Sequence, residues 1–251
     1  QPPKKITIAL NWVPEPEFGG IYEAQRSGAF KDQGVDATIK PGGAGAPTWQ
    51  IVATGRADFA VSSADEVVIA RQHGADIVAI FSTYQTCPQG IMVHASRGFK
   101  SLSDVFDHDG TVAMEAGLPY AKFLKRKFGY DHIRRIAYSG GVGNFLADKN
   151  FAQQCFVFSE PLAAKKAGAD PQVFLIADAG YNPYTGVIIT TSKTIQEQPD
   201  LCGAVTAALA RGWSDYLKDP KPANEMMHKL NRTMDAETFA AAAEAQKPLL
   251  E

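Results

Sequence analysis

Short apolar, β-branched runs alternate along the chain with segments whose apolar residues recur at helical spacing. This alternation is typical of βαβ units that build a mostly parallel sheet. The first set of predicted strands is Lys5–Leu10, Val35–Lys40, Phe59–Val61 and Ile77–Phe81, with helices at Gly20–Ser27, Trp49–Thr54 and Val67–Gln72. The second set of strands is Gly90–His94, Thr111–Met114, Ile133–Tyr138, Cys155–Phe158 and Val173–Ile176, with helices at Leu118–Lys127, Phe145–Ala152 and Leu162–Ala167.

The two sets share sequence landmarks as well as order. Lys40–Gly45 is echoed by Tyr138–Gly143, Phe59–Ser62 by Phe156–Ser159, and Gly74–Asp76 by Gly168–Asp170. The offsets are 98, 97 and 94 residues. Matched landmarks at a similar period indicate two α/β lobes that are built on one plan.

The chain is expected to cross between the lobes near Tyr84–Gln89 and to return near Asp178–Gly186. Val187–Thr190 then reads as a strand that rejoins the first lobe, followed by helices at Pro199–Lys218 and Pro222–Ala245. Lobe 1 would comprise residues 1–85 and 186–251, and lobe 2 residues 86–185. The expected fold is a two-lobed α/β clamshell with mixed, mostly parallel sheets and a cleft at the carboxyl ends of the strands.

Composition narrows the class of protein. The 251 residues are 45% apolar and 21% charged with a net charge of −2, which is typical of a globular chain and disfavours nucleic-acid binding through bulk charge. Apolar runs such as Ile77–Phe81 are far shorter than the roughly 20 residues of a membrane span. Three scattered cysteines and five scattered histidines match no metal-ligand spacing, so we expect neither a metal nor a cofactor.

The loop after the first strand carries the first candidate ligand contacts. Asn11 offers an amide and Trp12 an aromatic face, on a segment stiffened by Pro14 and Pro16. A buried tryptophan followed by an ordinary turn is the alternative interpretation.

Acidic residues dominate the other loops expected at the cleft. Ser63 and Glu66 fit a capping box, and Ser159 is expected to cap a helix that has Pro161 in its first turn. The loops contain Asp65, Glu66, Glu115 and Glu160 and no lysine or arginine. Carboxylates accept hydrogen bonds, so a ligand with N–H donors is favoured over an anion, although acids in a first turn can be purely structural.

Aromatic residues are frequent in the same loops. They are Phe18, Tyr84, Tyr120, Tyr138, Phe158, Tyr181 and Tyr184. Flat rings stack on flat ligands, so together with Trp12 they favour a heteroaromatic ligand, whereas core packing is the alternative for each one alone.

Several motifs resemble one known family. Ile8–Pro14 and Ala24–Asp36 resemble the opening of the NMT1/THI5-like family of type II solute-binding proteins, and the similarity continues through Thr54–Phe59, Val112–Gly117 and Leu209–Pro220. The resemblance implies an exported protein that delivers a small molecule to an ABC permease. It also places Asn11 and Trp12 in the ligand-contacting loop, with Glu115 and Glu160 in two loops of the second lobe.

The same family includes a pyrimidine synthase, which gives an alternative from the enzyme class. The resemblance places Ser62 where that enzyme has its cofactor-binding lysine and Glu66 where it has a reactive histidine. Ala179–Tyr184 replaces its cysteine-rich loop and contains no cysteine. A Schiff base needs an amine, so a non-enzymatic protein is expected.

The predicted function is therefore capture of a flat nitrogen heterocycle for an ABC importer, with a formylaminopyrimidine-like thiamin precursor as the first choice. Riboflavin, another heterocycle, a sulfonate, or a sensory role without a permease are the alternatives. The chain begins Gln1-Pro2-Pro3, without Met, which is typical of a mature protein whose export signal has been removed or of a shortened chain. The expected location is periplasmic or lipid-anchored and extracytoplasmic, and the expected form is a monomer. The predicted ligand-binding residues are Asn11, Trp12, Phe18, Ser62, Glu66, Tyr84, Glu115, Tyr138, Phe158, Glu160 and Tyr184.

Overall fold

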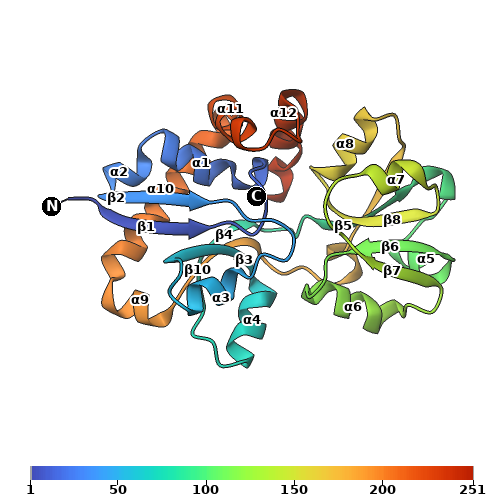
Figure 1. Cartoon of the computed structure of the whole chain (residues 1–251), viewed down its shortest axis with the longest axis horizontal. Helices are drawn as coiled ribbons and strands as arrows, with labels where there is room; N and C mark the ends of the chain where they lie inside the picture. Colours follow the sequence, from blue (N-terminus) through green and yellow to red (C-terminus); the bar gives the residue numbers. More distant parts are fainter. Residues whose placement is uncertain (1, 251) are drawn as a thin grey trace. The chain divides into compact units, whose positions relative to one another are not determined.

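The computed structural model describes residues 2–250; Gln1 and Glu251, the outer ends of the predicted first lobe, lie outside the described residues. The chain divides into two compact units (Figure 1). Unit 1 contains the described residues up to Gln85 and those from Tyr184 onward, and unit 2 contains Thr86–Pro183. Each unit is a five-stranded sheet with helices on both faces.

Unit 1 begins and ends the chain. Its strands, in sheet order, are β2 (Val35–Lys40), β1 (Lys4–Ala9), β3 (Phe59–Ser63), β10 (Thr185–Thr190) and β4 (Val78–Tyr84). Its α-helices are α1 (Gly19–Arg26), α2 (Ala29–Asp32), α3 (Thr48–Ala53), α4 (Ala64–Gln72), α9 (Ser192–Glu197), α10 (Pro199–Lys218), α11 (Lys221–Leu230) and α12 (Ala236–Ala245).

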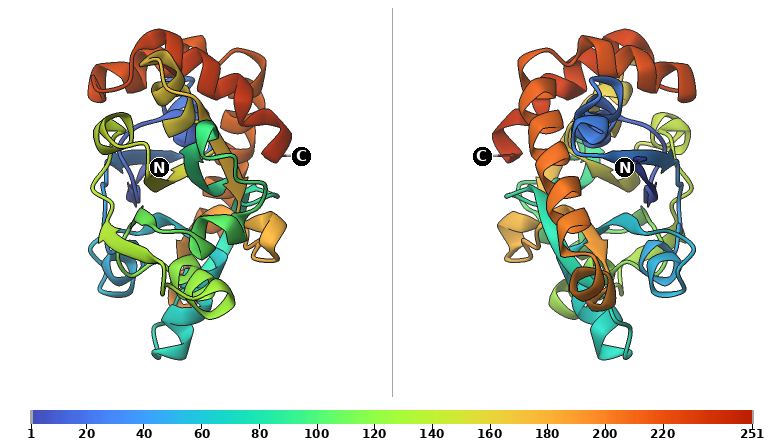
Figure 2. Two further views of the ribbon diagram at one scale, coloured as in Figure 1. Left: turned by 90° about the vertical axis from the view of Figure 1, so that its right-hand side faces the viewer. Right: turned by 90° about the vertical axis from the view of Figure 1, so that its left-hand side faces the viewer.

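Alternating side chains of β1 divide the core of unit 1 into two layers. Ile6 and Ile8 pack with the buried residues of α1 and α10, whereas Ala9 packs on the opposite face with residues of α3 and α4. This follows from the two-residue period of a strand. Figure 2 shows α11 and α12, in red, at the opposite end of the unit from α4, in cyan.

Unit 2 repeats the plan of unit 1. Its strands, in sheet order, are β7 (Ile133–Ala137), β6 (Gly110–Met114), β8 (Phe151–Phe156), β5 (Gln89–His94) and β9 (Pro171–Leu175). Its α-helices are α5 (Leu102–Asp107), α6 (Pro119–Phe128), α7 (Gly143–Ala147) and α8 (Glu160–Lys166). The main core of unit 2 joins α5 and α6 to one face of the sheet, while α7 and α8 pack on the other face (Figure 1).

Both sheets are mixed and mostly parallel, as predicted, since four of the five strands in each run in the same direction. In unit 1, β1 pairs in parallel with β2 and β3, and β10 pairs antiparallel with β3 and β4. In unit 2, β6 pairs in parallel with β7 and β8, and β5 pairs antiparallel with β8 and β9. The single reversed strand is in each case the strand that enters from the other unit, β10 or β5.

The largest error in the predicted strands concerns β8. The sequence predicts a helix over Phe145–Ala152 and a strand over Cys155–Phe158, whereas α7 ends at Ala147 and the strand spans Phe151–Phe156. Gln153 and Gln154 lie in the middle of this strand and are both buried. Because these two residues are polar, the pattern of apolar residues does not predict this central strand.

The last predicted helix is also wrong, because Pro222–Ala245 forms two helices, α11 and α12. Asn231 Nδ2 donates to the Pro14 carbonyl at 3.0 Å, and Thr233 N donates to Asn231 Oδ1 at 3.1 Å. Asp235 Oδ1 then accepts a bond from Thr238 N at 2.9 Å and caps α12. Polar side chains that bond to nearby backbone compete with a continuous helix.

Candidate functional site

The loop after β1 is held by a close backbone contact with the loop after β2. Gly42 N donates to the Trp12 carbonyl at 3.0 Å. A Cβ atom on Gly42 would lie 2.1 Å from the Leu10 carbonyl oxygen, so this approach requires glycine. The loop that carries Asn11 and Trp12 is therefore fixed by the glycine-rich segment that follows β2.

Asn11 and Trp12 lie in this loop with different surroundings. The Oδ1 atom of Asn11 is buried and accepts no hydrogen bond from any described residue. Trp12 is half-buried and packs against the unit 1 core. An unpaired buried amide oxygen is costly, which makes Asn11 Oδ1 an acceptor that a bound donor could satisfy.

The end of β3 and the start of α4 bring together Ser62, Ser63 and Glu66. Ser62 Oγ donates to Glu66 Oε2 at 2.9 Å, and Ser63 Oγ donates to the same oxygen at 3.1 Å. Ser63 is the N-cap residue, but its side chain makes no capping bond to the backbone, so the predicted capping box is wrong. The Ser63 hydroxyl bonds instead to the Asp65 and Glu66 carboxylates.

Burial shifts the Glu66 carboxyl toward its neutral form. Loss of solvation raises the pKa of Glu66 above its ordinary value, the bond from Ser62 lowers it, and the nearby Asp65 charge raises it further. Both serine hydroxyl bonds go to Oε2, and a backbone hydrogen bond from Ser63 also lowers the pKa of Glu66. The Glu66 carboxyl is thus held in place by the first turn of α4.

Tyr184 joins the same end of the sheet through its backbone. Its carbonyl accepts a hydrogen bond from Ala64 N, at the start of α4, at 2.9 Å. The side chain of Tyr184 is 52% exposed, so its ring is available to a ligand.

Phe18 and Tyr84 have the core role that the sequence left open as an alternative. Phe18 is 2% exposed and belongs to the unit 1 core. Tyr84 is 1% exposed, and its hydroxyl donates to Gln246 Oε1 at 2.5 Å. Burial raises the pKa of the Tyr84 hydroxyl well above its ordinary value.

In unit 2, Glu115 follows β6 and is held through its backbone by a buried glutamine. Glu115 N donates to Gln154 Oε1 at 2.5 Å, and the Tyr120 hydroxyl donates to the same oxygen. Arg135 of the neighbouring strand reaches the Glu115 carbonyl at 3.5 Å. The predicted loops contain no cation, but the structure thus brings one to Glu115 from β7.

Tyr138 and Glu160 meet at the ends of β7 and β8. The Tyr138 hydroxyl donates to Glu160 Oε1 at 2.9 Å, and Phe156 N donates to Glu160 Oε2 at 2.8 Å. Burial raises the pKa of the Glu160 carboxyl, while these bonds lower it. Pro161 lies in the first turn of α8 as predicted, but the predicted Ser159 side-chain cap is not formed.

The ring of Phe158 is buried and is not exposed to a ligand beside Tyr138 and Glu160. It is 1% exposed and makes an edge contact with Phe156, with 5.7 Å between the ring centroids. Its position corresponds to the core alternative for the aromatic residues.

Sequence reasoning missed the two glutamines that order these loops. Gln153 Nε2 donates to the Gly141 carbonyl at 3.0 Å, and Gln154 Oε1 holds the Glu115 loop. The available signal was a polar pair inside the apolar segment Phe151–Phe158. Buried amides of this kind are kept only where they are hydrogen-bonded.

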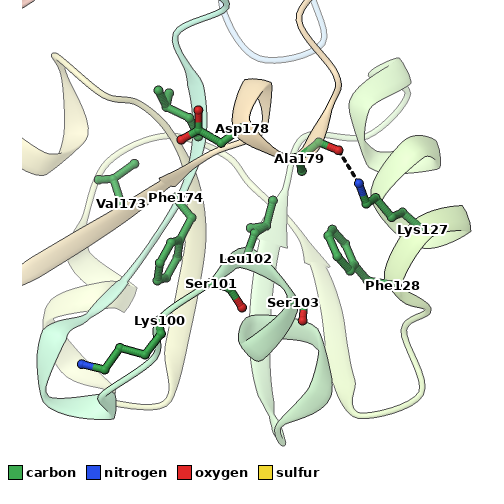
Figure 3. A pocket seen from close by; sticks show the side chains of 11 residues that line it. Lys100, Ser101, Leu102, Ser103, Lys127, Phe128, Val173, Phe174, Asp178 and Ala179 are labelled. Atoms are coloured by element: carbon green, nitrogen blue, oxygen red, sulfur yellow. Dashed lines mark hydrogen bonds between the residues drawn. The ribbon is translucent and has the colours of Figure 1, made fainter.

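A pocket of about 420 Å³ lies elsewhere in unit 2 (Figure 3). It is formed by the start of α5, the end of α6, the edge strand β9 and the 3-10 helix η3 (Ala177–Ala179). None of the eleven predicted ligand-binding residues lines it.

A membrane-spanning helix and a metal site are both absent from the described residues. Over residues 2–250, no helix is both long and apolar enough to cross a membrane. In the same part of the chain, no group of three or more His, Cys, Asp or Glu side chains could hold a metal ion.

Comparison with solved structures defines the class of fold. The periplasmic aliphatic sulphonate binding protein SsuA of Escherichia coli aligns with a TM-score of 0.74 at 14% identity, over 96% of this chain and 79% of that chain. The two sheets with their inserted antiparallel strands are thus those of the periplasmic binding protein fold.

Sequence comparison gives the family. A profile described as NMT1/THI5 like matches residues 15–223, and the chain belongs to this family. The riboflavin-binding protein RibY of Chloroflexus aurantiacus is 22% identical over 89% of this chain, which spans 65% of the length of that relative. The formylaminopyrimidine-binding protein of Halalkalibacterium halodurans is 20% identical over 98% of this chain and 75% of its own length.

Proposed function

We propose that this protein is the solute-binding component of an ABC importer. We propose further that it captures a flat nitrogen heterocycle whose N–H groups donate hydrogen bonds to the protein. The observation that carries the proposal is the buried Asn11 Oδ1, an unpaired acceptor in the same loop as the Trp12 indole. The family and the fold support the transport role, because the relatives compared above are named as binding proteins for riboflavin, formylaminopyrimidine and sulphonate.

The residues of unit 1 favour a planar donor over an anion. A heterocycle would stack on Trp12 and donate N–H groups to Asn11 Oδ1 and to the Glu66 carboxyl. An anionic sulfonate would face the Asp65 carboxylate, which is hydrogen-bonded to Ser63 beside Glu66, and like charges repel.

A formylated aminopyrimidine is the specific ligand that we propose first. Its amino and formamido N–H groups supply donors, and its ring is flat and small. Riboflavin has a larger ring system with an imide N–H and is the second candidate, because the RibY relative is named for it.

Unit 2 would contribute Glu115, Tyr138 and Glu160 to the same ligand. Glu160 already accepts bonds from Tyr138 and Phe156, so its carboxyl is oriented before a ligand arrives. We propose that the protein binds its ligand reversibly and releases it chemically unchanged to a permease.

The residues of this chain argue against the chemistry of the pyrimidine synthase. By the family resemblance, Ser62 and Glu66 stand where the synthase has its amine and its imidazole, and neither side chain can form a Schiff base. The proposed setting is extracytoplasmic, and the proposed form is a monomer.

Isothermal titration calorimetry with a ligand panel tests this function. The panel contains a formylated aminopyrimidine, the free aminopyrimidine, riboflavin and an alkanesulfonate. The proposal expects the formylated aminopyrimidine to bind most tightly and the sulfonate not to bind. Tight sulfonate binding would overturn the electrostatic argument, and preferred riboflavin binding would keep the transport class but replace the ligand.

A further inference from the structure

The two edges of the unit 2 sheet differ in how they are protected. One edge strand, β7, carries Arg134 and Arg135, which are both exposed. The other, β9, has the sequence Pro-Gln-Val-Phe-Leu and contains no charged residue. Charged side chains normally keep exposed edges from pairing with other chains, so β9 is the edge that is open to pairing.

The hydrogen-bond pattern of β9 shows which backbone groups are unused. Ala95 N donates to the Asp170 carbonyl at 2.8 Å, and Ile176 N donates to the Gln89 carbonyl at 3.1 Å. Between these bonds the antiparallel register alternates, so Gln172 and Phe174 bond to β5. The N–H and C=O groups of Val173 and Leu175 consequently point away from the sheet.

The pocket of Figure 3 lies directly beside these unused groups. It is lined by Val173, Phe174 and Leu175 of β9, and its volume of about 420 Å³ is that of a small-ligand or side-chain site. Figure 3 shows the side chains of Phe174, Leu102 and Phe128 around the hollow. A residue of an added strand opposite Phe174 would point to the face on which Phe174 lies, and so into the pocket.

The charged side chains at the rim of the pocket indicate which charge a bound molecule would carry. Lys100 and Lys127 line the pocket and are exposed, against a single acid, Asp178. The Lys127 ammonium also donates to the Ala179 carbonyl (Figure 3). The rim is therefore net positive and complements acidic side chains.

We propose that β9 and the adjoining pocket form a docking site for an extended peptide segment of a partner protein. The segment adds to the sheet as a strand next to β9, inserts one large apolar side chain beside Phe174, and carries acidic residues at its ends. Backbone bonds to Val173 and Leu175 supply the pairing, and the pocket supplies the selectivity. This inference is independent of the ligand that the protein carries.

Fluorescence anisotropy with a designed peptide tests the site on the full chain. The probe is a capped heptapeptide with valine and threonine, a central phenylalanine and a glutamate at each end. Binding is expected with a Kd on the order of 100 μM. The matched control peptide is N-methylated at alternate residues, which removes the pairing donors, and it should not bind.

Two variants of the protein separate the contributions of charge and backbone. Lys100→Glu is expected to weaken peptide binding about 3-fold or more, whereas Lys122→Glu, on an exposed position of α6 outside the pocket, should leave it unchanged. Val173→Pro removes one outward N–H and is expected to weaken binding at least about 5-fold. Thermal melting checks that each variant is folded, and Lys100→Glu alters only an exposed side chain.

Amide hydrogen exchange decides between strand addition and other modes of binding. With the peptide bound, the amides of Val173 and Leu175 should exchange more slowly. The proposal is overturned if no peptide binds at about 1 mM, if the N-methylated peptide binds equally, or if these amides stay unprotected. Protection that rises with protein concentration in the absence of peptide would assign the edge to a second copy of this chain and contradict the proposed partner.

Discussion

At the scale of single residues, the structure separates aromatic side chains that can meet a ligand from those that build the core. Trp12 is half-buried and Tyr184 is exposed, whereas Phe18, Tyr84 and Phe158 are almost fully buried. The sequence placed all five in loops near strand ends, and it could not rank their exposure. Burial depends on which helix covers each loop, and that is a property of the tertiary fold.

Trp12→Ala is predicted to weaken ligand binding about 10- to 100-fold, because stacking of one flat ring is worth about 1–3 kcal/mol. The melting temperature should change little, since Trp12 is only partly buried. Calorimetry and thermal melting measure the two effects. Trp49→Ala, at a half-buried tryptophan of α3, is the control and should leave affinity unchanged. Retained affinity with a collapsed melting temperature would mean that Trp12 is a core residue.

Glu160 gives a prediction for the pH dependence of stability. The pKa of Glu160 is raised in the folded state, so the folded protein binds the proton of this carboxyl more tightly than the unfolded chain does. The contribution of Glu160 to the free energy of unfolding is therefore largest below the ordinary Glu pKa of about 4.3 and falls as pH rises through the raised folded pKa.

Glu160→Gln removes this titration and should be more stable than the native protein at neutral pH. Its amide can accept from Phe156 N and donate to the Tyr138 hydroxyl, so both existing contacts keep a partner. The difference between the two proteins should shrink as pH falls toward 4, as measured by urea unfolding at several pH values. A difference that grows in acid would contradict the assigned cause.

At the scale of elements, the glycine after β2 controls the candidate ligand loop. Gly42→Ala would force a Cβ atom against the Leu10 carbonyl oxygen, where the distance is 2.1 Å, and the loop must shift. We expect a loss of about 1–3 kcal/mol in stability and weaker ligand binding. Gly43→Ala is the matched control, because nothing lies within 4 Å of its added Cβ atom. Equal behaviour of the two variants, by urea unfolding and calorimetry, would exclude a positioning role for Gly42.

The strand β8 gives a second prediction at this scale. Gln154→Leu leaves Glu115 N and the Tyr120 hydroxyl without their shared acceptor, at a cost of about 2–4 kcal/mol for two unsatisfied donors. Tyr120→Phe removes one donor, so the double variant should lose less than the sum of the single losses. Urea unfolding of the four proteins completes this cycle, and strict additivity would show that the two residues are not coupled.

The same strand shows where prediction from sequence fails. Periodicity located β2 and α10 with their observed ends, because their apolar and polar positions follow one regular pattern. It misplaced β8, because Gln153 and Gln154 are buried by hydrogen bonds to loops that are distant in sequence. It also joined α11 to α12, because the Asn231 contact with Pro14 spans more than two hundred residues.

At the scale of the whole molecule, the repeated plan was readable from the sequence and the pairing of strands was not. Matched landmarks indicated two similar lobes, and both sheets do have the same order, with β10 and β5 in equivalent positions. The landmark pairing of Phe59–Ser62 with Phe156–Ser159 is inexact, since β3 continues to Ser63 while β8 ends at Phe156. Strand direction depends on how the chain enters each sheet, and local sequence does not encode it.

A crystal structure of the protein with the tightest-binding member of the ligand panel tests the central claim most directly. The account predicts an intact heterocycle stacked on Trp12, with a ligand N–H donor within about 3.2 Å of Asn11 Oδ1. A ligand seated away from Trp12, with Asn11 Oδ1 still unpaired, would contradict it.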